Sequence, residues 1–222
     1  MLWLLIAGFF CWLILREFLR QVVTPAGYDG PDPTPISKSY VLTMAALAIL
    51  FAYSPVRYWQ FERMLSAKAR ILSESPQAKV HCNTVVDTFF DSNVFAAGHA
   101  SPDTGQIVFQ HPWCGRLMDH LRAPETATRE GIFSVQMFAH EAMHIRGELN
   151  EARTDCQAIQ RHYRAALLLG IPDRIAKEGA LTYYNVEYQR RGAIGGFIAH
   201  YYSDQCAPGK ALDEKLPDST WN

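Results

Sequence analysis

Two runs of apolar residues lie near the N-terminus of the chain. Residues 1–15 (MLWLLIAGFFCWLIL) carry no charged side chain, and residues 39–56 (SYVLTMAALAILFAYSPV) are uncharged between Lys38 and Arg57. Both runs are apolar on every face, a pattern that favours a helix in lipid over an amphipathic surface helix. The second run is long enough to cross a hydrocarbon layer of about 30 Å, and the first can do so if the Arg16 side chain reaches back to the surface.

We therefore predict a two-span membrane anchor over residues 1–56, with residues 16–38 as the connecting loop. A cleavable signal peptide or a buried hairpin are the alternatives, but no Lys or Arg precedes the first run and no small-residue cleavage site precedes Tyr28. Arg16 and Arg20 follow an uncharged N-terminal flank, which favours an inside loop and a soluble domain outside the cytoplasm. The positive charges on the two sides of the second run are nearly balanced, so the orientation depends on that flank.

The remaining residues, 57–222, change from short β-type segments to helical spacing. Residues 57–75 have an imperfect helical pattern that continues the second apolar run. Residues 79–86, 94–98 and 106–110 resemble strands, and the turn-rich residues 101–105 predict a β-hairpin in a small sheet. Helices are predicted over residues 129–146, 151–169 and 173–191. The predicted fold class is α+β: a mostly helical domain with a small sheet, preceded by two transmembrane helices.

A pair of histidines in the first of these helices has the spacing of metal ligands. In His140-Glu141-Ala142-Met143-His144, the two imidazoles are four residues apart and lie on one face of a helix, one turn from each other. Both can reach one ion, and Glu141 on the neighbouring flank can reach a water molecule at that ion without binding the ion itself. The pattern predicts a zinc site with Glu141 as the general base.

A catalytic zinc site requires a third protein ligand and leaves the fourth position for water. Gly147 can end the helix and reverse the chain, and Asn150 is a good N-cap for a second helix that opens with Glu151. We expect Glu151 to be the third ligand, with Glu148 as the alternative. Asp155, one turn after Glu151, either accepts the other ring proton of a histidine or is an ordinary acidic residue near a helix start.

These residues resemble the gluzincin metallopeptidases, zincins whose metal is held by the two histidines of HExxH and a glutamate from a following helix. Residues 150–155 (NEARTD) resemble the NExxSD element of thermolysin-like members, and residues 93–98 (NVFAAG) followed by a strand and HExxH resemble HtpX-like membrane metallopeptidases. The sequence is most similar to uncharacterised bacterial membrane-associated metallopeptidases with a minigluzincin-like core. In HtpX-like proteins, an edge strand beside the active helix is expected to hold extended substrate.

The resemblance implies a zincin-like fold, a Zn²⁺ cofactor and a peptide or protein substrate. The expected function is zinc-dependent hydrolysis of peptide bonds by an enzyme anchored in the lipid bilayer of the cell membrane. The alternative is a non-catalytic, membrane-tethered module that binds zinc or senses peptides. The net charge of −1, without a basic run, gives no reason to expect nucleic acid as a partner. Gluzincins usually stabilise the oxyanion with a His or Tyr, for which the candidates are His162, Tyr163, Tyr183, Tyr184, Tyr188 and His200.

Four of the five cysteines lie outside the apolar runs, and none forms a CxxC pair. An even number without that motif favours two disulfides in an oxidising compartment, against the alternative of four buried thiols in the cytoplasm. Cys82 and Cys114 flank the predicted hairpin, Cys156 follows Glu151 on its helix, and Cys206 begins an irregular tail. We expect Cys82 to pair with Cys114, and Cys156 with Cys206.

Overall fold

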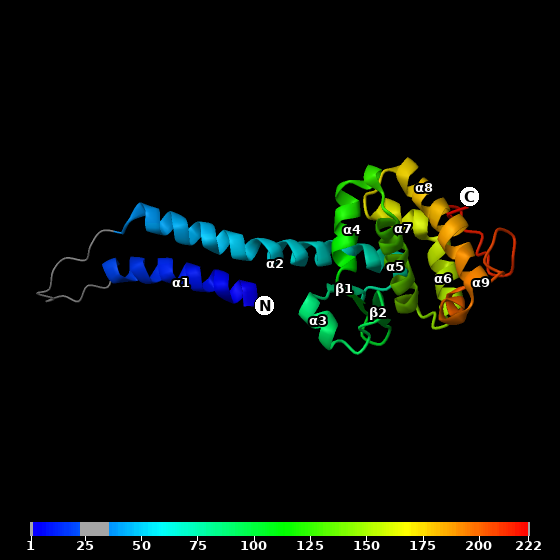
Figure 1. Ribbon diagram of the computed structural model, residues 1–222, viewed down its shortest axis with the longest axis horizontal. Helices are drawn as coiled ribbons and strands as arrows, with labels where there is room; N and C mark the ends of the chain where they lie inside the picture. The colour runs from blue at the N-terminus through cyan, green and yellow to red at the C-terminus, as the bar shows by residue number, and fades with distance from the viewer. Residues whose placement is uncertain (1, 23–35, 222) are drawn as a thin grey trace, which may run out of the picture. The chain divides into compact units, whose positions relative to one another are not determined.

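The two apolar runs form helices in the computed structural model, which describes residues 2–22 and 36–221 of the chain. Helix α1 comprises Leu2–Val22 and α2 comprises Lys38–Ser73. The two helices lie side by side (Figure 1), and the rings of Trp3 and Phe10 stack on Phe51 with centroid distances of 5.5 and 5.7 Å. Most of the predicted connecting loop, residues 23–35, lies outside the described residues.

Among the described helices, α2 alone combines the length and the apolar composition that a membrane crossing requires. Only 6% of its most apolar window is buried, which distinguishes α2 from the core helix of a soluble protein. One span is therefore supported where two were expected. Arg16, Glu17 and Arg20 lie within the last turns of α1, so its uncharged part spans only about 20 Å. A second span stays a prediction.

The chain divides into two compact units, the first ending at Gln60 and the second beginning at Phe61, close to the predicted boundary between residues 56 and 57. Helix α2 continues past Pro55 and includes most of the helix predicted at residues 57–75. Its last residues belong to the second unit, which also contains the sheet and the remaining helices.

A three-stranded sheet with the order β1-β3-β2 lies within the second unit. Strands β2 (Gly98–Ser101) and β3 (Gln106–Phe109) form the predicted hairpin, and β1 (Lys79–Cys82) pairs with β3 in parallel. The turn between β2 and β3 requires Gly105, whose φ is 71° and whose added Cβ would lie 2.5 Å from the Gln77 carbonyl oxygen. The strand predicted at residues 94–98 is wrong in its bounds, since β2 only begins at Gly98.

Residues 79–86 were also expected to form one strand, but β1 ends at Cys82 and helix α3 (Val85–Phe90) follows. The Thr84 side chain accepts a hydrogen bond from the Asp87 N–H, and the Asp87 carboxylate accepts one from the Thr84 N–H. This capping box satisfies the first turn of a helix and outweighs the β preference of Val85 and Val86.

The helices of the second unit are packed around α5 (Arg129–Arg146), whose bounds agree with the prediction. Helix α5 contacts β2 and β3 as well as its helical neighbours, and the buried rings of Phe109 and Phe138 lie 6.5 Å apart across this contact. The fold is mostly helical with a small sheet, as predicted. The other elements are α4 (Trp113–Arg122), η1 (Pro124–Thr126), α6 (Glu151–Gln160), α7 (His162–Leu168), α8 (Asp173–Thr182), η2 (Tyr183–Tyr188), α9 (Gln189–Ile194) and η3 (Gly196–Tyr201).

Two long helices of the prediction are interrupted. The helix expected at residues 151–169 is divided at Arg161, a buried residue whose guanidinium donates to Glu214 at 2.5 Å. The helix expected at residues 173–191 begins at Asp173 but passes through the π-helical η2 before α9.

The four cysteines pair as predicted. Cys82 and Cys114 have a Cα separation of 5.7 Å and join β1 to the start of α4, and Cys156 and Cys206 have one of 5.5 Å. The second pair fastens the C-terminal tail to α6, the helix that opens with Glu151. Cys11 is exposed and has no disulfide partner among the described residues.

Replacing Cys156 and Cys206 together by serine should lower the free energy of unfolding by about 2 to 4 kcal/mol. The bridge closes a 50-residue separation, and its loss frees the unfolded chain. Chemical unfolding in detergent measures this difference, with Cys11→Ser as the control that should leave the midpoint unchanged. Four free thiols in the unreduced parent protein would contradict both pairings.

Candidate metal centre

Helix α5 and the turn between α5 and α6 are defined by three local signals. The Thr128 side chain accepts the Gly131 N–H at 3.0 Å and caps the start of α5, and Gly147 ends the helix with a φ of 109°. Nothing lies within 4 Å of a Cβ added at Gly147, so the glycine is required by its backbone angle rather than by lack of space. The Asn150 side chain then accepts the Arg153 N–H at 3.0 Å and starts α6.

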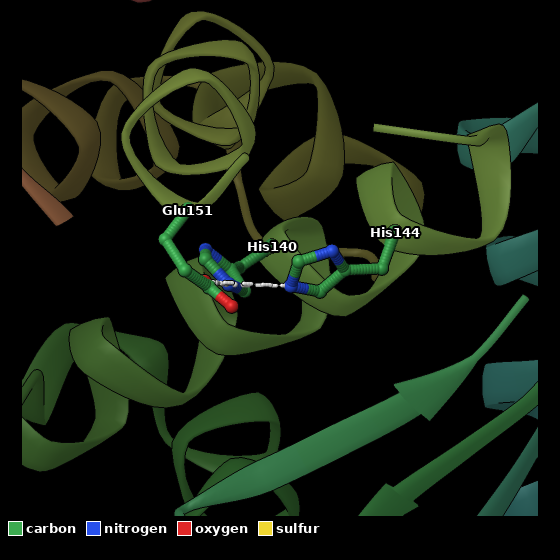
Figure 2. Close-up of side chains that lie close together, drawn as sticks. All are labelled: His140, His144 and Glu151. Atoms are coloured by element: carbon green, nitrogen blue, oxygen red, sulfur yellow. Dashed lines mark hydrogen bonds and ion pairs between the residues drawn. The ribbon is translucent and has the colours of Figure 1, made fainter. Parts of the chain in front are cut away.

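This reversal brings the first residue of α6 against the histidine pair of α5 (Figure 2). The His140 Nε2 lies 3.1 Å from the His144 Nε2 and 3.1 Å from the Glu151 Oε2, and the last two atoms are 3.5 Å apart. Ligand atoms about 2.1 Å from a tetrahedral zinc ion lie about 3.4 Å from each other. The three donor atoms therefore have the spacing of one face of a metal coordination sphere, and the group could hold a metal ion.

The Nδ1 atoms of His140 and His144, which point away from the three donor atoms, are hydrogen-bonded to acceptors. The His140 Nδ1 faces the Asp155 Oδ1 at 3.2 Å, and the His144 Nδ1 faces the Glu148 carbonyl oxygen at 2.8 Å. Since a carboxylate and a carbonyl can only accept, each Nδ1 carries the proton that it donates. Each Nε2 then faces the Glu151 carboxylate, and a metal ion binds that nitrogen only by displacing the proton that the carboxylate would accept.

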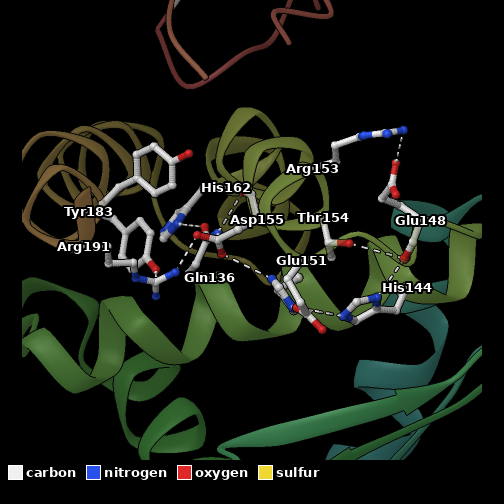
Figure 3. Close-up of polar contacts among 12 residues, drawn as sticks. Gln136, His144, Glu148, Glu151, Arg153, Thr154, Asp155, His162, Tyr183 and Arg191 are labelled. Carbon is white, nitrogen blue, oxygen red and sulfur yellow. Dashed lines mark hydrogen bonds and ion pairs between the residues drawn. The ribbon is translucent and has the colours of Figure 1, made fainter. Parts of the chain in front are cut away.

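Glu148, the alternative third ligand, is used differently. Its carbonyl oxygen accepts from His144 and from the Thr154 hydroxyl, and its side chain accepts the Asn150 N–H at 2.9 Å (Figure 3). The carboxylate thus contributes to the turn before α6, whereas that of Glu151 joins the histidines.

Glu141 is buried beside the cluster, and among the described residues its Oε2 has no hydrogen-bond partner. Burial raises the pKa of this carboxyl, against the positive charge that His140 and His144 can carry. A buried oxygen without a partner normally marks a strained or functional position. Strand β2 lies against this side chain, since a Cβ added at Gly98 would be 3.4 Å from the Glu141 Oε1.

Asp155 connects His140 to the interior of the domain, and Figure 3 shows its contacts with Gln136 and Arg191. Its buried carboxylate accepts from His140, from the Gln136 amide at 3.1 Å and from the Arg191 guanidinium at 2.5 Å. Gln136 in turn accepts from the His162 Nδ1 at 3.0 Å. This network fixes the ring of His140 from α5, α6, α7 and α9 at once. The expected role of Asp155 beside a histidine agrees with its position.

The charges at the cluster strongly alter its protonation. Burial lowers the pKa of His140, but hydrogen bonds to Asp155 and Glu151 outweigh it and raise that pKa to about 10. Hydrogen bonds from His140 and His144 lower the pKa of Glu151 to about 2. A proton and a metal ion would compete for the same nitrogen atoms, because only the neutral imidazole is a ligand.

A cavity of about 630 Å³ opens beside His140 and Glu141. Its walls are largely apolar, and Tyr201 from η3 lies at its border with a ring centroid 5.7 Å from that of His140. Burial, followed by the negative charge of Glu151, raises the pKa of Tyr201, so its hydroxyl keeps the proton that it can donate. The apolar wall is formed by Phe95, Trp113, Phe133, Met137, Ile194 and Ile198.

None of the six residues considered for oxyanion stabilisation lines this cavity. His162 and Tyr183 are buried in the polar network, and Tyr188 donates to the Ser203 carbonyl oxygen at 3.1 Å. Tyr201 and Arg191 were missed. No local motif marks them, because they come from the end of the chain and reach the centre only through tertiary packing. Gln136 could have been noticed, since it precedes His140 by one helical turn.

No protein-family model, curated protein or solved structure matches the chain.

Exchanging Glu151 for Gln should reduce the affinity for Zn²⁺ by at least about 100-fold. Loss of a partner that only orients a ligand costs about 10- to 100-fold, and loss of a direct ligand should exceed that. Glu148→Gln removes the same charge three residues away and is the matched control, with an affinity expected to stay near that of the parent. Calorimetric titration of both variants decides between the two glutamates, and equal losses would refute the assignment.

His162 should make the protein sensitive to acid. Burial, followed by repulsion from His120, lowers the pKa of His162 to about 3. The unfolded chain takes up this proton below a pH of about 6.5, which the folded chain cannot do, so stability is lost as the pH falls from about 6.5 toward 3. The loss due to this residue approaches about 1.4 kcal/mol per pH unit. The free energy of unfolding is measured at several pH values between 8 and 4 for the parent and for His162→Gln. Its dependence on pH should be weaker in the variant by about this slope, and equal slopes for the two proteins would contradict the prediction.

Proposed function

We propose that this chain is a membrane-anchored zinc metallopeptidase of the gluzincin type. The observation that supports it most strongly is the convergence of His140 Nε2, His144 Nε2 and Glu151 Oε2 beside the buried carboxyl of Glu141. Two imidazoles and one carboxylate, with three protein ligands in all, are the donor set of many catalytic zinc sites.

When bound, zinc would supply Lewis acidity to the carbonyl group of a peptide bond and to a water molecule. Glu141 accepts one proton from the attacking water molecule while the oxygen of that water bonds to the carbonyl carbon. The same carboxyl then gives this proton to the amide nitrogen, whose bond to the carbonyl carbon breaks. Asp155 keeps His140 in the required tautomer throughout. Tyr201, whose ring lies beside that of His140, would donate a hydrogen bond to the carbonyl oxygen as negative charge grows on that oxygen.

Two features support a polypeptide substrate. Strand β2 is an edge of the sheet, paired with β3 on one side only, and its first residue adjoins Glu141. An extended peptide can add to such an edge through backbone hydrogen bonds. The apolar cavity beside Glu141 is large enough for an aromatic or long aliphatic side chain of that peptide.

The proposed location is the cell membrane, with the catalytic unit outside the cytoplasm. Helix α2 has the composition of a membrane span, and the two disulfide pairs are stable where the environment is oxidising. We retain α1 as the second span of a multi-pass anchor, with the connecting loop inside.

The alternative, a tethered module that only binds zinc or senses peptides, would be favoured by a fourth protein ligand. Within residues 2–22 and 36–221, the cluster of donor atoms has three members. A cavity adjoins it on the side of Glu141. Both observations favour an enzyme.

Glu141→Gln should retain zinc and lose cleavage. The amide keeps the shape of the side chain but cannot accept the proton of water, so turnover should fall by at least about 100-fold. Zinc content and cleavage of a peptide library are measured together, with Glu125→Gln on the exposed surface as the control. A Glu141→Gln protein that cleaves as fast as the parent would show that another group is the base.

A further inference from the structure

An exposed apolar surface lies on α3 and the turn that follows it. It consists of Val85, Val86, Phe89, Phe90 and Phe95, which we call the α3 surface. Phe90 is 80% exposed and Phe95 is 101% exposed, and no residue of α3 is buried. The rings of Phe89 and Phe90 contact each other, with centroids 5.3 Å apart. Apolar side chains gathered in this way mark a surface that binds something apolar.

The polar residues of this segment make the attachments to the domain. The Thr88 hydroxyl accepts the His111 N–H at 2.8 Å, and the Asp91 carboxylate accepts from the Asn83 amide at 3.0 Å. Thr88 is the one residue of α3 that is partly buried. The usual amphipathic order is therefore reversed: Thr88 and Asp91 bond to the protein, and two valines and three phenylalanines are exposed.

Few residues and one strand separate the α3 surface from the uncharged run of α2. Within the second unit, Glu62 of α2 accepts the Cys82 N–H at 2.8 Å, and Ser66 accepts the Val80 N–H at 2.9 Å. Strand β1 thus runs back along α2 toward Glu62, and α3 begins three residues after Cys82. Glu62 follows Val56, the end of the uncharged run, by six residues. Even a fully extended chain of that length covers only about 20 Å.

We propose that the α3 surface docks onto the lipid bilayer that α2 enters. This inference rests on the membrane anchor of the proposed function. Because the connection to the membrane span is short, the α3 surface stays near the bilayer and the effective concentration of lipid around it is high. A few apolar side chains are then enough for contact. The single charged residue of α3 is Asp87, and the contact therefore needs no anionic lipid. Because Phe95 also lines the cavity, docking brings the cavity entrance to the membrane surface. The favoured substrates are polypeptides that lie on or emerge from the membrane.

Spin labels on the full chain in phosphatidylcholine nanodiscs test this contact. The label is placed at Phe90→Cys, and separately at Val86→Cys, in a Cys11→Ser background. Collisions with oxygen, which concentrates in lipid, are compared with collisions with a water-soluble nickel chelate. Ile49→Cys in α2 is the reference for the anchor. Val186→Cys in η2, an exposed apolar position that is 55% accessible, is the reference for water.

The labels at residues 86 and 90 are expected to favour oxygen, as at residue 49, and to differ from the label at residue 186. If they favour the nickel chelate while residue 49 favours oxygen, docking is wrong and the anchor remains. If residue 49 favours the chelate, the anchor fails and the docking proposal fails with it. Protection of residues 86 and 90 from both reagents would also overturn lipid docking, in favour of a protein partner.

Discussion

The candidate metal centre depends on the contacts that two acidic residues of α6 make with the His140 imidazole. Glu151 and Asp155, one turn apart on that helix, lie 3.1 and 3.2 Å from the two ring nitrogens of His140. This arrangement requires α6 to return along α5, which in turn requires the left-handed conformation at Gly147. As a result, the His140 Nδ1 is bound to a fixed acceptor, and its Nε2 faces the other donor atoms of a group that could hold a metal ion.

Much of the candidate metal centre could be predicted from the sequence, because the residues that determine the histidine pair and the turn between α5 and α6 act locally. The spacing of His140 and His144, the helix end at Gly147 and the cap at Asn150 all act within a few residues. They predict that Glu151 points toward the histidines, with Glu148 left as the alternative that these local signals do not exclude. The bounds of α5 and the cysteine pairing also agree with prediction, since helical periodicity and the order of elements restrict the choices.

The rest depends on contacts between residues far apart in the chain. Arg191 reaches Asp155 across 36 positions, and Tyr201 approaches His140 from η3, where no periodic pattern or motif marks it. The error at α3 has a different cause. Val85 and Val86 favour a strand by composition, but the Thr84 cap starts a helix there, and Thr88 faces the protein in place of the valines.

X-ray absorption at the zinc edge of the purified full chain reports the atoms around the bound metal, and so tests whether His140, His144 and Glu151 hold it. We expect two imidazole nitrogens and light oxygen neighbours at about 2.0 to 2.2 Å, with a geometry close to tetrahedral. Imidazole scattering should fall by half in His144→Ala. A sulfur shell at about 2.3 Å, or a spectrum unchanged by that substitution, would contradict the assignment of His140, His144 and Glu151.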